Sequence, residues 1–321
     1  MTCVLGSGQA AASPPAWTIQ EAPATPALFG VSCPSTSFCS EAGLEVPGVA
    51  FHGVSCTSAT DCMAVGWSAA GGRPAPLAKR WDGTTWTAQS IPLPSGAMQA
   101  WLEGVSCTSA TDCVAVGSYE DGSNPDVHGG LIEHWDGATW TRQTFIDPST
   151  DGVTALHGVS CSSASACTAV GTFYAGGRRF TLVERWDGSA WRQQLTTDTP
   201  VLGDNRFLGV SCPSSSTCTA VGTVVERWNG TTWNVQQTPS TELAGVSCAS
   251  TSICTALGGD VVERWTSDGG WRTQSVPLPA PSNEVQFTGV SCPKPNFCTA
   301  VGYYWTPGGP TGSQAFVEQY S

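Results

Sequence analysis

The chain has 321 residues and a formal net charge of −12 at pH 7, because 25 acidic residues outnumber 13 lysines and arginines. This balance argues against nucleic acid as a partner, since the phosphate backbone repels negative charge. No apolar run reaches the roughly 18 residues that membrane insertion requires. The length suits two average domains or one all-β ring, so internal repeats have to be sought first.

The first element in the chain is MTCVLGSGQAAASPPAW, in which Ala10, Ala11 and Ala12 resemble the small-residue cleavage site of an export signal. The basic and apolar regions that belong upstream of such a site are missing from the sequence. We therefore expect residues 1–12 to be the end of a signal peptide and residues 13–321 to form a single domain. An ordinary flexible N-terminus is the alternative.

Fourteen of the 15 cysteines form regular pairs six residues apart, and only Cys3 is left over. Such pairing, in a chain poor in lysine and rich in Gly, Ser, Thr and Pro, is typical of disulfides made in an oxidising compartment. Zinc is the alternative, but zinc cysteines usually lie two to four residues apart, with a second pair or histidines nearby. We predict a secreted or cell-surface, extracellular protein with these disulfides: Cys33–Cys39, Cys56–Cys62, Cys107–Cys113, Cys161–Cys167, Cys212–Cys218, Cys248–Cys254 and Cys292–Cys298.

Each cysteine pair lies in a repeated unit, and most pairs follow one another at intervals of 36 to 54 residues. One unit reads LHGVSC (residues 156–161), CTAVG (167–171), LVERW (182–186) and WRQQ (191–194). Short Val, Thr and Trp runs broken by Ser, Gly, Asp and Pro predict four strands and no helix. The Asp-Gly that follows LVERW predicts a tight turn between the third and fourth strands. Repeats of this period are typical of solenoids, propellers or arrays.

The fold class predicted from these units is all-β, a β-propeller of four-stranded blades with one disulfide in each blade hairpin. AWTIQ (residues 16–20) resembles an isolated fourth strand and FVEQY (316–320) an isolated third strand. We expect these N- and C-terminal strands to pair and close the ring, which removes exposed sheet edges. Only 23 residues separate Cys33 from Cys56. We therefore predict seven blades with a reduced first blade, and six blades with an inserted hairpin is the alternative.

The repeat LHGVSC…CTAVG…LVERWDGSAW resembles the Cys-paired repeat of a largely uncharacterised family of secreted actinobacterial proteins. Its WDGxxW turns are also similar to the Asp-box and Rax-type repeats of other propellers. The resemblance covers almost the whole of residues 13–321. It implies a propeller fold and brings no established catalytic motif.

Strand alternation places the cysteine hairpins and Asp-Gly turns on one face of the ring and the variable connections on the other. Variable loops on a rigid scaffold usually carry function. Aromatic side chains there can stack on sugars or anchor a protein, and arginines, together with Asp204 and Arg206, can contact carboxylated sugars. The alternative is that the aromatics pack the stems of their own long hairpins. The predicted ligand-binding residues are Trp67, Trp101, Tyr119, Tyr174, Arg178, Arg179, Tyr303, Tyr304 and Trp305.

One position inside the repeat varies freely, the residue before the Gly of the first strand. His52, Glu103 and His157 occupy it in three consecutive units and can converge at the mouth of the central channel. Two imidazoles and a carboxylate can bind a divalent metal or act as base and acid. Isolated half-buried polar residues are the alternative. Residues 120–126 (EDGSNPD) offer oxygen ligands for calcium, although a solvated acidic loop explains them as well.

These patterns favour a monomeric, secreted binding module for a glycan or a surface protein, with no cofactor, no nucleic acid and no membrane insertion. The alternative is a polysaccharide-active enzyme, a lyase or glycosidase, that uses His52, Glu103 and His157. A purely structural protein of the cell envelope is a further alternative. The Glu-Arg pairs of the third strand and the Ser before each first cysteine recur too regularly to be site residues, and we expect them to be structural.

Overall fold

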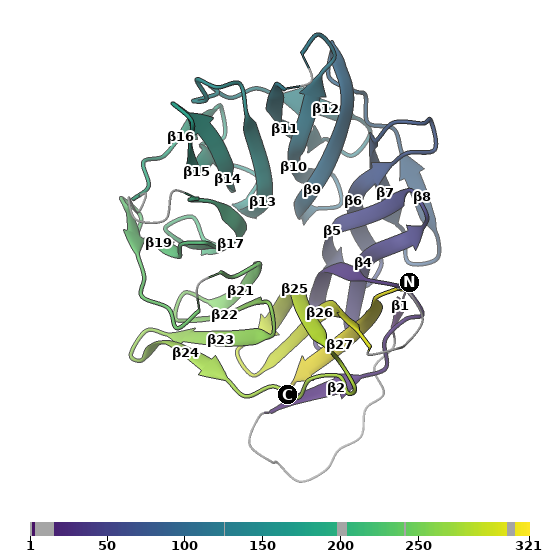
Figure 1. Cartoon of the computed structure of the whole chain (residues 1–321), viewed down its shortest axis with the longest axis vertical. Helices are drawn as coiled ribbons and strands as arrows, with labels where there is room; N and C mark the ends of the chain where they lie inside the picture. The colour runs from purple at the N-terminus through teal and green to yellow at the C-terminus, as the bar shows by residue number, and fades with distance from the viewer. Residues whose placement is uncertain (1, 4–15, 125, 198–203, 241, 307–311) are drawn as a thin grey trace.

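The computed structural model describes residues 2–3, 16–124, 126–197, 204–240, 242–306 and 312–321. Their strands form six antiparallel sheets arranged around a central axis (Figure 1). Five of the sheets have four strands and one has seven. Nothing in the described part of the chain is a helix long and apolar enough to cross a membrane. The molecule is therefore an all-β propeller of four-stranded blades.

One blade shows how the repeat becomes structure. β13 (Thr154–Ser163) lies nearest the axis and is followed outward by β14 (Ala166–Ala175), β15 (Arg178–Trp186) and β16 (Trp191–Gln193). Each of the four predicted strand sequences falls in the expected strand. The Gly of the turn after the third strand, WDG in three blades and WNG in one, has φ between 91° and 97°, a left-handed conformation that glycine adopts without a steric cost.

The other blades repeat this order. The bounds are β9 (Ala97–Ser109), β10 (Asp112–Asp121), β11 (His128–Trp135) and β12 (Trp140–Gln143); β17 (Phe207–Ser214), β18 (Thr217–Gly222), β19 (Glu226–Trp228) and β20 (Trp233–Val235); β21 (Gly245–Ser250), β22 (Ile253–Gly258), β23 (Val261–Thr266) and β24 (Gly270–Gln274). The seven-stranded sheet contains a complete set of β5 (Val49–Ser58), β6 (Asp61–Ser68), β7 (Ala75–Trp81) and β8 (Trp86–Gln89).

The first cysteine hairpin does not form a blade of its own, so the prediction of seven blades is wrong. It consists of β3 (Leu28–Ser35) and β4 (Phe38–Val46). After a two-residue turn at residues 47–48, the chain returns directly as β5, and Leu44 pairs with Ala50. This turn leaves no room for a third and fourth strand, and the hairpin joins the sheet of β5–β8. Six blades with an inserted hairpin, the alternative, matches the sheets.

Strands from both ends of the chain lie in sheets with distant partners. β2 (Trp17–Gln20) pairs with β27 (Gln314–Tyr320) at the outside of β26 (Phe297–Trp305) and β25 (Glu284–Lys294). Trp17 lies opposite Tyr320. β1 (Thr2–Cys3) pairs with β4 and places Cys3 opposite Cys39. The predicted signal-peptide segment, residues 1–12, lies almost entirely outside the described residues.

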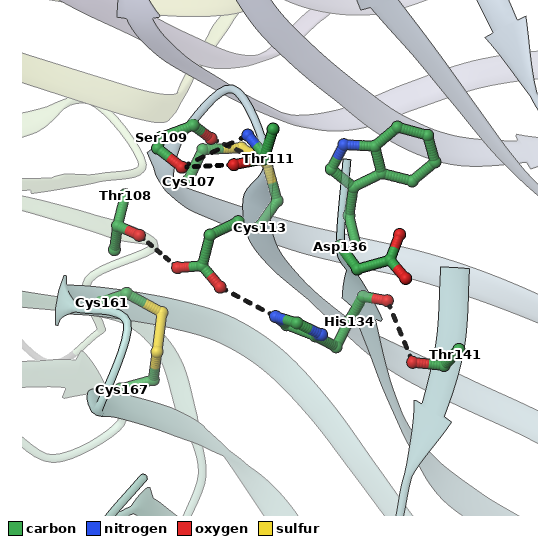
Figure 2. Close-up of polar contacts among 12 residues, drawn as sticks. Cys107, Thr108, Ser109, Thr111, Cys113, His134, Asp136, Thr141, Cys161 and Cys167 are labelled. Carbon is green, nitrogen blue, oxygen red and sulfur yellow. Dashed lines mark hydrogen bonds and ion pairs between the residues drawn. A yellow bond between two sulfur atoms is a disulfide. The ribbon is translucent and has the colours of Figure 1, made fainter. Parts of the chain in front are cut away.

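All seven predicted disulfides are present. Each joins the two strands of one hairpin, with a Cα–Cα distance of 3.9 to 4.1 Å. Figure 2 shows two of them in neighbouring blades, Cys107–Cys113 and Cys161–Cys167. So many intramolecular bridges indicate an oxidising environment.

The serine before each first cysteine joins neighbouring hairpins. Its Oγ accepts a hydrogen bond of 2.9 Å from the backbone N–H of the first cysteine in the next hairpin. The last of these bonds, from Cys33 to Ser291, links the first hairpin to the last, so seven hairpins surround the axis although there are six sheets. The bonds run from Cys56 to Ser32, Cys107 to Ser55, Cys161 to Ser106, Cys212 to Ser160, Cys248 to Ser211, Cys292 to Ser247 and Cys33 to Ser291.

The Glu-Arg pairs of the third strand also contact the scaffold. Glu184 is fully buried, and the Arg185 guanidinium lies 4.7 Å from the ring centre of Trp228 in the next blade. In the preceding blade His134 replaces the arginine, and its Nε2 lies 2.8 Å from Asp112 Oδ1 (Figure 2). These contacts connect one blade to the next or brace a single hairpin, as expected for structural residues.

Candidate functional site

The freely varying position of the repeat is the extra residue of a β-bulge. In β13, for example, Leu156 pairs with Gly171 and Gly158 with Val170, so His157 between them has no partner opposite. A bulge leaves its extra residue out of the ladder and re-aims its side chain, often beside functional sites. This explains why the repeat does not determine the residue. The bulge residues are Phe29, His52, Glu103, His157, Leu208 and Thr288.

These bulge residues follow one another around the mouth of the central channel. A Cβ built on Gly53 meets the carbonyl oxygen of Glu103 at 3.2 Å, and one built on Gly104 meets that of His157 at 3.1 Å. Just below them, the seven Gly-Val pairs of the innermost strands line a narrow channel of about 180 Å³. His52, Glu103 and His157 therefore lie in consecutive positions along one arc of the mouth.

Two of these three side chains form a pair. His52 Nδ1 lies 2.5 Å from Glu103 Oε2, and the ring of Phe29 packs edge-on against the imidazole at 5.0 Å. Both side chains of the pair are partly exposed, 25% and 32%. A partly exposed imidazole bonded to a carboxylate is accessible to a ligand at the mouth.

His157 lies apart from this pair. Burial lowers the pKa of its imidazole, the positive charges of Arg206 and Arg179 lower it further, and Glu103 opposes both. No described hydrogen bond joins His157 to His52 or Glu103. Across the described residues, no three His, Cys, Asp or Glu side chains are grouped to hold a metal ion. The three predicted residues therefore do not form a three-ligand metal centre.

His157 belongs instead to an open pocket of about 590 Å³ on the variable face. Three neighbouring blades build it. β10, β11 and their connection supply Ser118, Asp126 and His128; the next blade supplies Val153, Ala155, His157, Thr172, Tyr174 and Arg179; the segment entering β17 supplies Arg206 and Leu208. Two imidazoles, two guanidiniums, one phenol, one serine hydroxyl and the carboxylate of Asp126 thus line a common space.

Two arginines give this pocket its charge. Arg179 Nε donates to the hydroxyl of Tyr174 at 2.6 Å, and its guanidinium lies 4.9 Å from the centre of that ring. Asp204 lies 2.5 Å from Arg179 and 3.7 Å from Arg206, which also bonds Glu242 at 2.5 Å. The two carboxylates are about half exposed, whereas Arg206 Nε is buried and has no hydrogen-bond partner among the described residues. The sequence brought Arg179, Asp204 and Arg206 into one prediction but missed Glu242.

A second aromatic group lies along the mouth beside Phe29. Tyr303 packs edge-on against Phe29 at 6.4 Å and against Trp305 at 5.0 Å. Trp305 is 37% exposed. Together with the contact between Phe29 and His52, these rings form a continuous chain of aromatic contacts from the end of β26 to the His52–Glu103 pair.

The other predicted ligand-binding residues do not line this pocket. Tyr119 lies under the guanidinium of Arg142 and packs on the core of its own blade, and Tyr304 packs against Phe316, so both support their stems. Arg178 is exposed over Phe180 and does not line the pocket. Half-buried Trp67 and Trp101 lie in strands, opposite Ala50 and Ser118. The predicted aromatics therefore form no single cluster.

The acidic segment of residues 120–126 is not assembled as a calcium site. Glu120 is buried and bonded to Gln99, while Asp121 accepts hydrogen bonds from the hydroxyl and backbone N–H of Ser123, which lower the pKa of that carboxyl. Asp126 points into the pocket described above. Residue 125 lies outside the described part of the chain. The segment turns its oxygens in different directions.

Comparison with known proteins adds information on the fold. The structure of YCF48 bound to D1 peptide superimposes with a TM-score of 0.56 and 11% identity, covering 95% of this chain and 94% of that one. The structure of U3-55K gives 0.54 and 10%, covering 85% and 81%. This chain is a β-propeller. No protein-family model and no curated protein matches it, so the resemblance to the actinobacterial repeat family is not established.

A further pocket, which the sequence did not predict, lies beside the first cysteine hairpin. It measures about 260 Å³ and lies between β4 and the sheet of β5–β8, with Phe51, Lys79 and Trp86 in its lining. The signal that could have located it is the interval of only 23 residues between Cys33 and Cys56, because a blade that lacks outer strands leaves its neighbour uncovered.

Proposed function

We propose that the protein is a secreted binding module that takes an acidic glycan at the mouth of its variable face. The observation that supports this most is the pocket in which Arg179, Arg206, Tyr174 and His157 meet, built by three neighbouring blades. In a chain of net charge −12, two guanidiniums line one open pocket, where the carboxylate of Asp126 lines it too and Asp204 and Glu242 pair with the guanidiniums.

The chemistry of the pocket matches carboxylated sugars. Guanidinium groups bind carboxylates through paired, charge-assisted hydrogen bonds. The carboxylates that now pair with Arg179 and Arg206 come from Asp204 and Glu242, which are half exposed, so a ligand carboxylate can replace them without a buried charge being left alone. The hydroxyl of Ser118 and the imidazole of His128 then face the sugar hydroxyls.

Calorimetry with polygalacturonate and its carboxyl-reduced form tests this proposal. We expect binding of the acidic polymer only, and a loss of about tenfold or more in affinity for Arg206→Gln, because a charge-assisted hydrogen bond is lost. Arg178→Gln is the matched control, since this neighbouring arginine lies outside the pocket. Equal binding of the neutral polymer, or an Arg206→Gln variant that binds normally, contradicts the proposal.

A second candidate ligand is a surface protein. YCF48, which has the same fold, is solved bound to the D1 peptide, and the exposed ring of Trp305 with Tyr303 behind it is suited to anchoring a protein. Under this alternative, Trp305→Ala abolishes capture of a cell-surface protein, while Arg206→Gln leaves that capture intact. The two variants therefore separate the two ligands.

Catalysis is the other alternative, and the contact between His52 and Glu103 favours it. A lyase or glycosidase that uses this pair releases shorter products from a polysaccharide, and His52→Ala and Glu103→Gln abolish that release. If polygalacturonate binds with unchanged chain length after prolonged incubation, binding without catalysis is the better description.

A further inference from the structure

The pocket of about 590 Å³ occupies only one part of the mouth. The innermost strands, which carry the bulge residues, follow one another around the axis (Figure 1). A Cβ built on Gly289 meets the carbonyl oxygen of Phe29 at 3.0 Å, and one built on Gly30 meets that of His52 at 2.7 Å. The mouth therefore continues from the last blade through the first cysteine hairpin to His52.

Three aromatic rings lie along this part of the mouth. Tyr303 and Trp305 are two residues apart in β26, so their side chains leave the same face of the strand. Trp305 pairs with Glu284 in the ladder, so that a strand end positions its partly exposed ring. Phe29 contacts the ring of Tyr303 from the neighbouring hairpin. We call Trp305, Tyr303 and Phe29 the aromatic row.

The contact between His52 and Glu103 joins the aromatic row to the arginine pocket, the space of about 590 Å³ that Arg179 and Arg206 line. The bulge positions of Glu103 and His157 are consecutive around the mouth. Burial lowers the pKa of the His157 imidazole, and this imidazole also feels the charges of Glu103 on one side and of the two arginines on the other. Row, pair and pocket therefore form one continuous surface.

The two ends of this surface suit different chemical groups. Guanidiniums in the pocket bind a carboxylate through charge-assisted hydrogen bonds. Aromatic rings in the row suit the apolar face of an uncharged sugar ring. Between them lies the carboxylate of Glu103, 32% exposed, which accepts hydrogen bonds from sugar hydroxyls and repels a second carboxylate. The net charge of −12 adds to this repulsion.

We propose that the mouth binds a glycan chain in which one uronic acid unit is joined to several neutral sugars. The acid lies in the arginine pocket, and the neutral units pass over His52 and Glu103 onto the aromatic row. This inference rests on the proposed function and narrows its ligand class. A chain of uronic acids alone still binds through one unit, but it gains little along the row, because its other carboxylates meet Glu103 and the rings.

Calorimetry on the full chain with three probes of defined length tests this ligand class. The probes are a disaccharide of glucuronic acid and xylose, a pentasaccharide of one glucuronic acid and four xyloses, and pentagalacturonate. We expect the pentasaccharide to bind at least about tenfold more tightly than the disaccharide, because its neutral units contact the aromatic row. Pentagalacturonate should gain about threefold or less over the same disaccharide, since its added carboxylates are repelled.

Two variants assign the gain to its residues. Trp305→Ala should weaken binding of the pentasaccharide to the level of the disaccharide and leave the disaccharide unchanged, whereas Trp305→Phe, which keeps a ring, retains most of the gain. Arg206→Gln should weaken both oligosaccharides by the same factor, because they share the acid unit. Ile19→Ala is the matched control, since this side chain is 45% exposed on the outermost strand of the same blade as Trp305.

The outcomes separate this inference from the function on which it rests. Equal binding of disaccharide and pentasaccharide, an equal gain for pentagalacturonate, or a gain that survives in Trp305→Ala overturns the inference alone, provided that Arg206→Gln still weakens binding. If no acidic oligosaccharide binds, or if Arg206→Gln binds normally, the proposed function fails and the inference fails with it. If Trp305→Ala abolishes capture of a cell-surface protein but leaves the gain intact, the aromatic row belongs to a protein ligand and the inference is overturned.

Discussion

The two faces of the ring obey different rules. On one face, every hairpin carries the same disulfide and the same hydrogen bond from the N–H of the next hairpin's first Cys to Ser Oγ. On the other face, the bulge residue changes from phenylalanine to histidine, glutamate, leucine or threonine. The difference teaches that repetition in this chain follows from the contacts between hairpins: the residues that form the disulfide and the serine bond are repeated, whereas the bulge residue, which has no partner opposite, is free to differ.

Reduction of the disulfides removes the repeated bridges of one face and should have the largest effect on stability. Each bridge closes a loop six residues long, worth about 2 kcal/mol in the chain-entropy model. Because seven hairpins lose their bridges together, we expect the reduced protein to unfold on warming at least about 20 °C below the oxidised one. Circular dichroism measures the two transitions. Coincident transitions would show that the bridges add nothing beyond the ladders they join.

Adjacent residues on one hairpin allow a sharper comparison. A Cβ on Gly171 meets the carbonyl oxygen of Ala155 at 2.0 Å and the Cα of Leu156 at 2.8 Å, both backbone atoms that cannot yield. We expect Gly171→Ala to lower the free energy of unfolding by about 4 kcal/mol. His157→Ala, at the bulge on the facing strand, is the control and should change it by about 1 kcal/mol or less. Denaturant unfolding that gives equal losses for both variants contradicts the rule.

Buried carboxyls on the scaffold predict an unusual dependence on pH. Burial raises the pKa of Glu184 and of Glu318 to about 8, and that of Glu133 to about 7. Above pH 5 the unfolded chain ionises these groups, while the folded chain keeps Glu133 protonated up to about pH 7 and Glu184 and Glu318 up to about pH 8. The folded state therefore binds more protons, and its stability falls as pH rises, by up to about 1.4 kcal/mol per pH unit for each group.

Glu184→Gln isolates one of these groups. The amide resembles the protonated carboxyl in shape but does not ionise. The free energy of unfolding of the variant should therefore fall less steeply between pH 5 and pH 8, by the amount that one ionising group contributes. Denaturant unfolding at several pH values measures this slope, and Glu45→Gln, at a half-exposed side chain, is the control. An unchanged slope in Glu184→Gln means that Glu184 is already ionised in the folded protein.

Much of the scaffold could be predicted from the sequence because it is repeated. The spacing of Cys161 and Cys167 indicated a bridged hairpin, and the Asp-Gly after Trp186 indicated the turn between β15 and β16; both follow from local geometry. The arc of His52, Glu103 and His157 followed from chain order alone, since consecutive hairpins are neighbours in a ring.

What could not be predicted depends on contacts between distant residues. Nothing local in Tyr119 distinguishes it from Tyr174, yet one packs on its own blade and the other faces a pocket, because Arg142 and Arg179 approach them from different strands. The same applies to Glu242, which meets Arg206 only across two blades. Blade number failed for a related reason: where the β3–β4 hairpin attaches depends on its pairing with β5.

The serine bonds offer the smallest and most exact test of the difference between the faces. Ser160 Oγ accepts from the backbone N–H of Cys212, and Ser160→Ala leaves that buried donor without a partner. We expect a loss of about 1 kcal/mol in the free energy of unfolding, measured by denaturant titration. Ser162→Ala is the control, since its hydroxyl bonds only within its own turn. Ser291→Ala removes the bond between the last hairpin and the first. If the ring acts as one cooperative unit, Ser291→Ala costs as much as Ser160→Ala; a much smaller loss means that the first hairpin is held mainly by β5 and adds little to the ring.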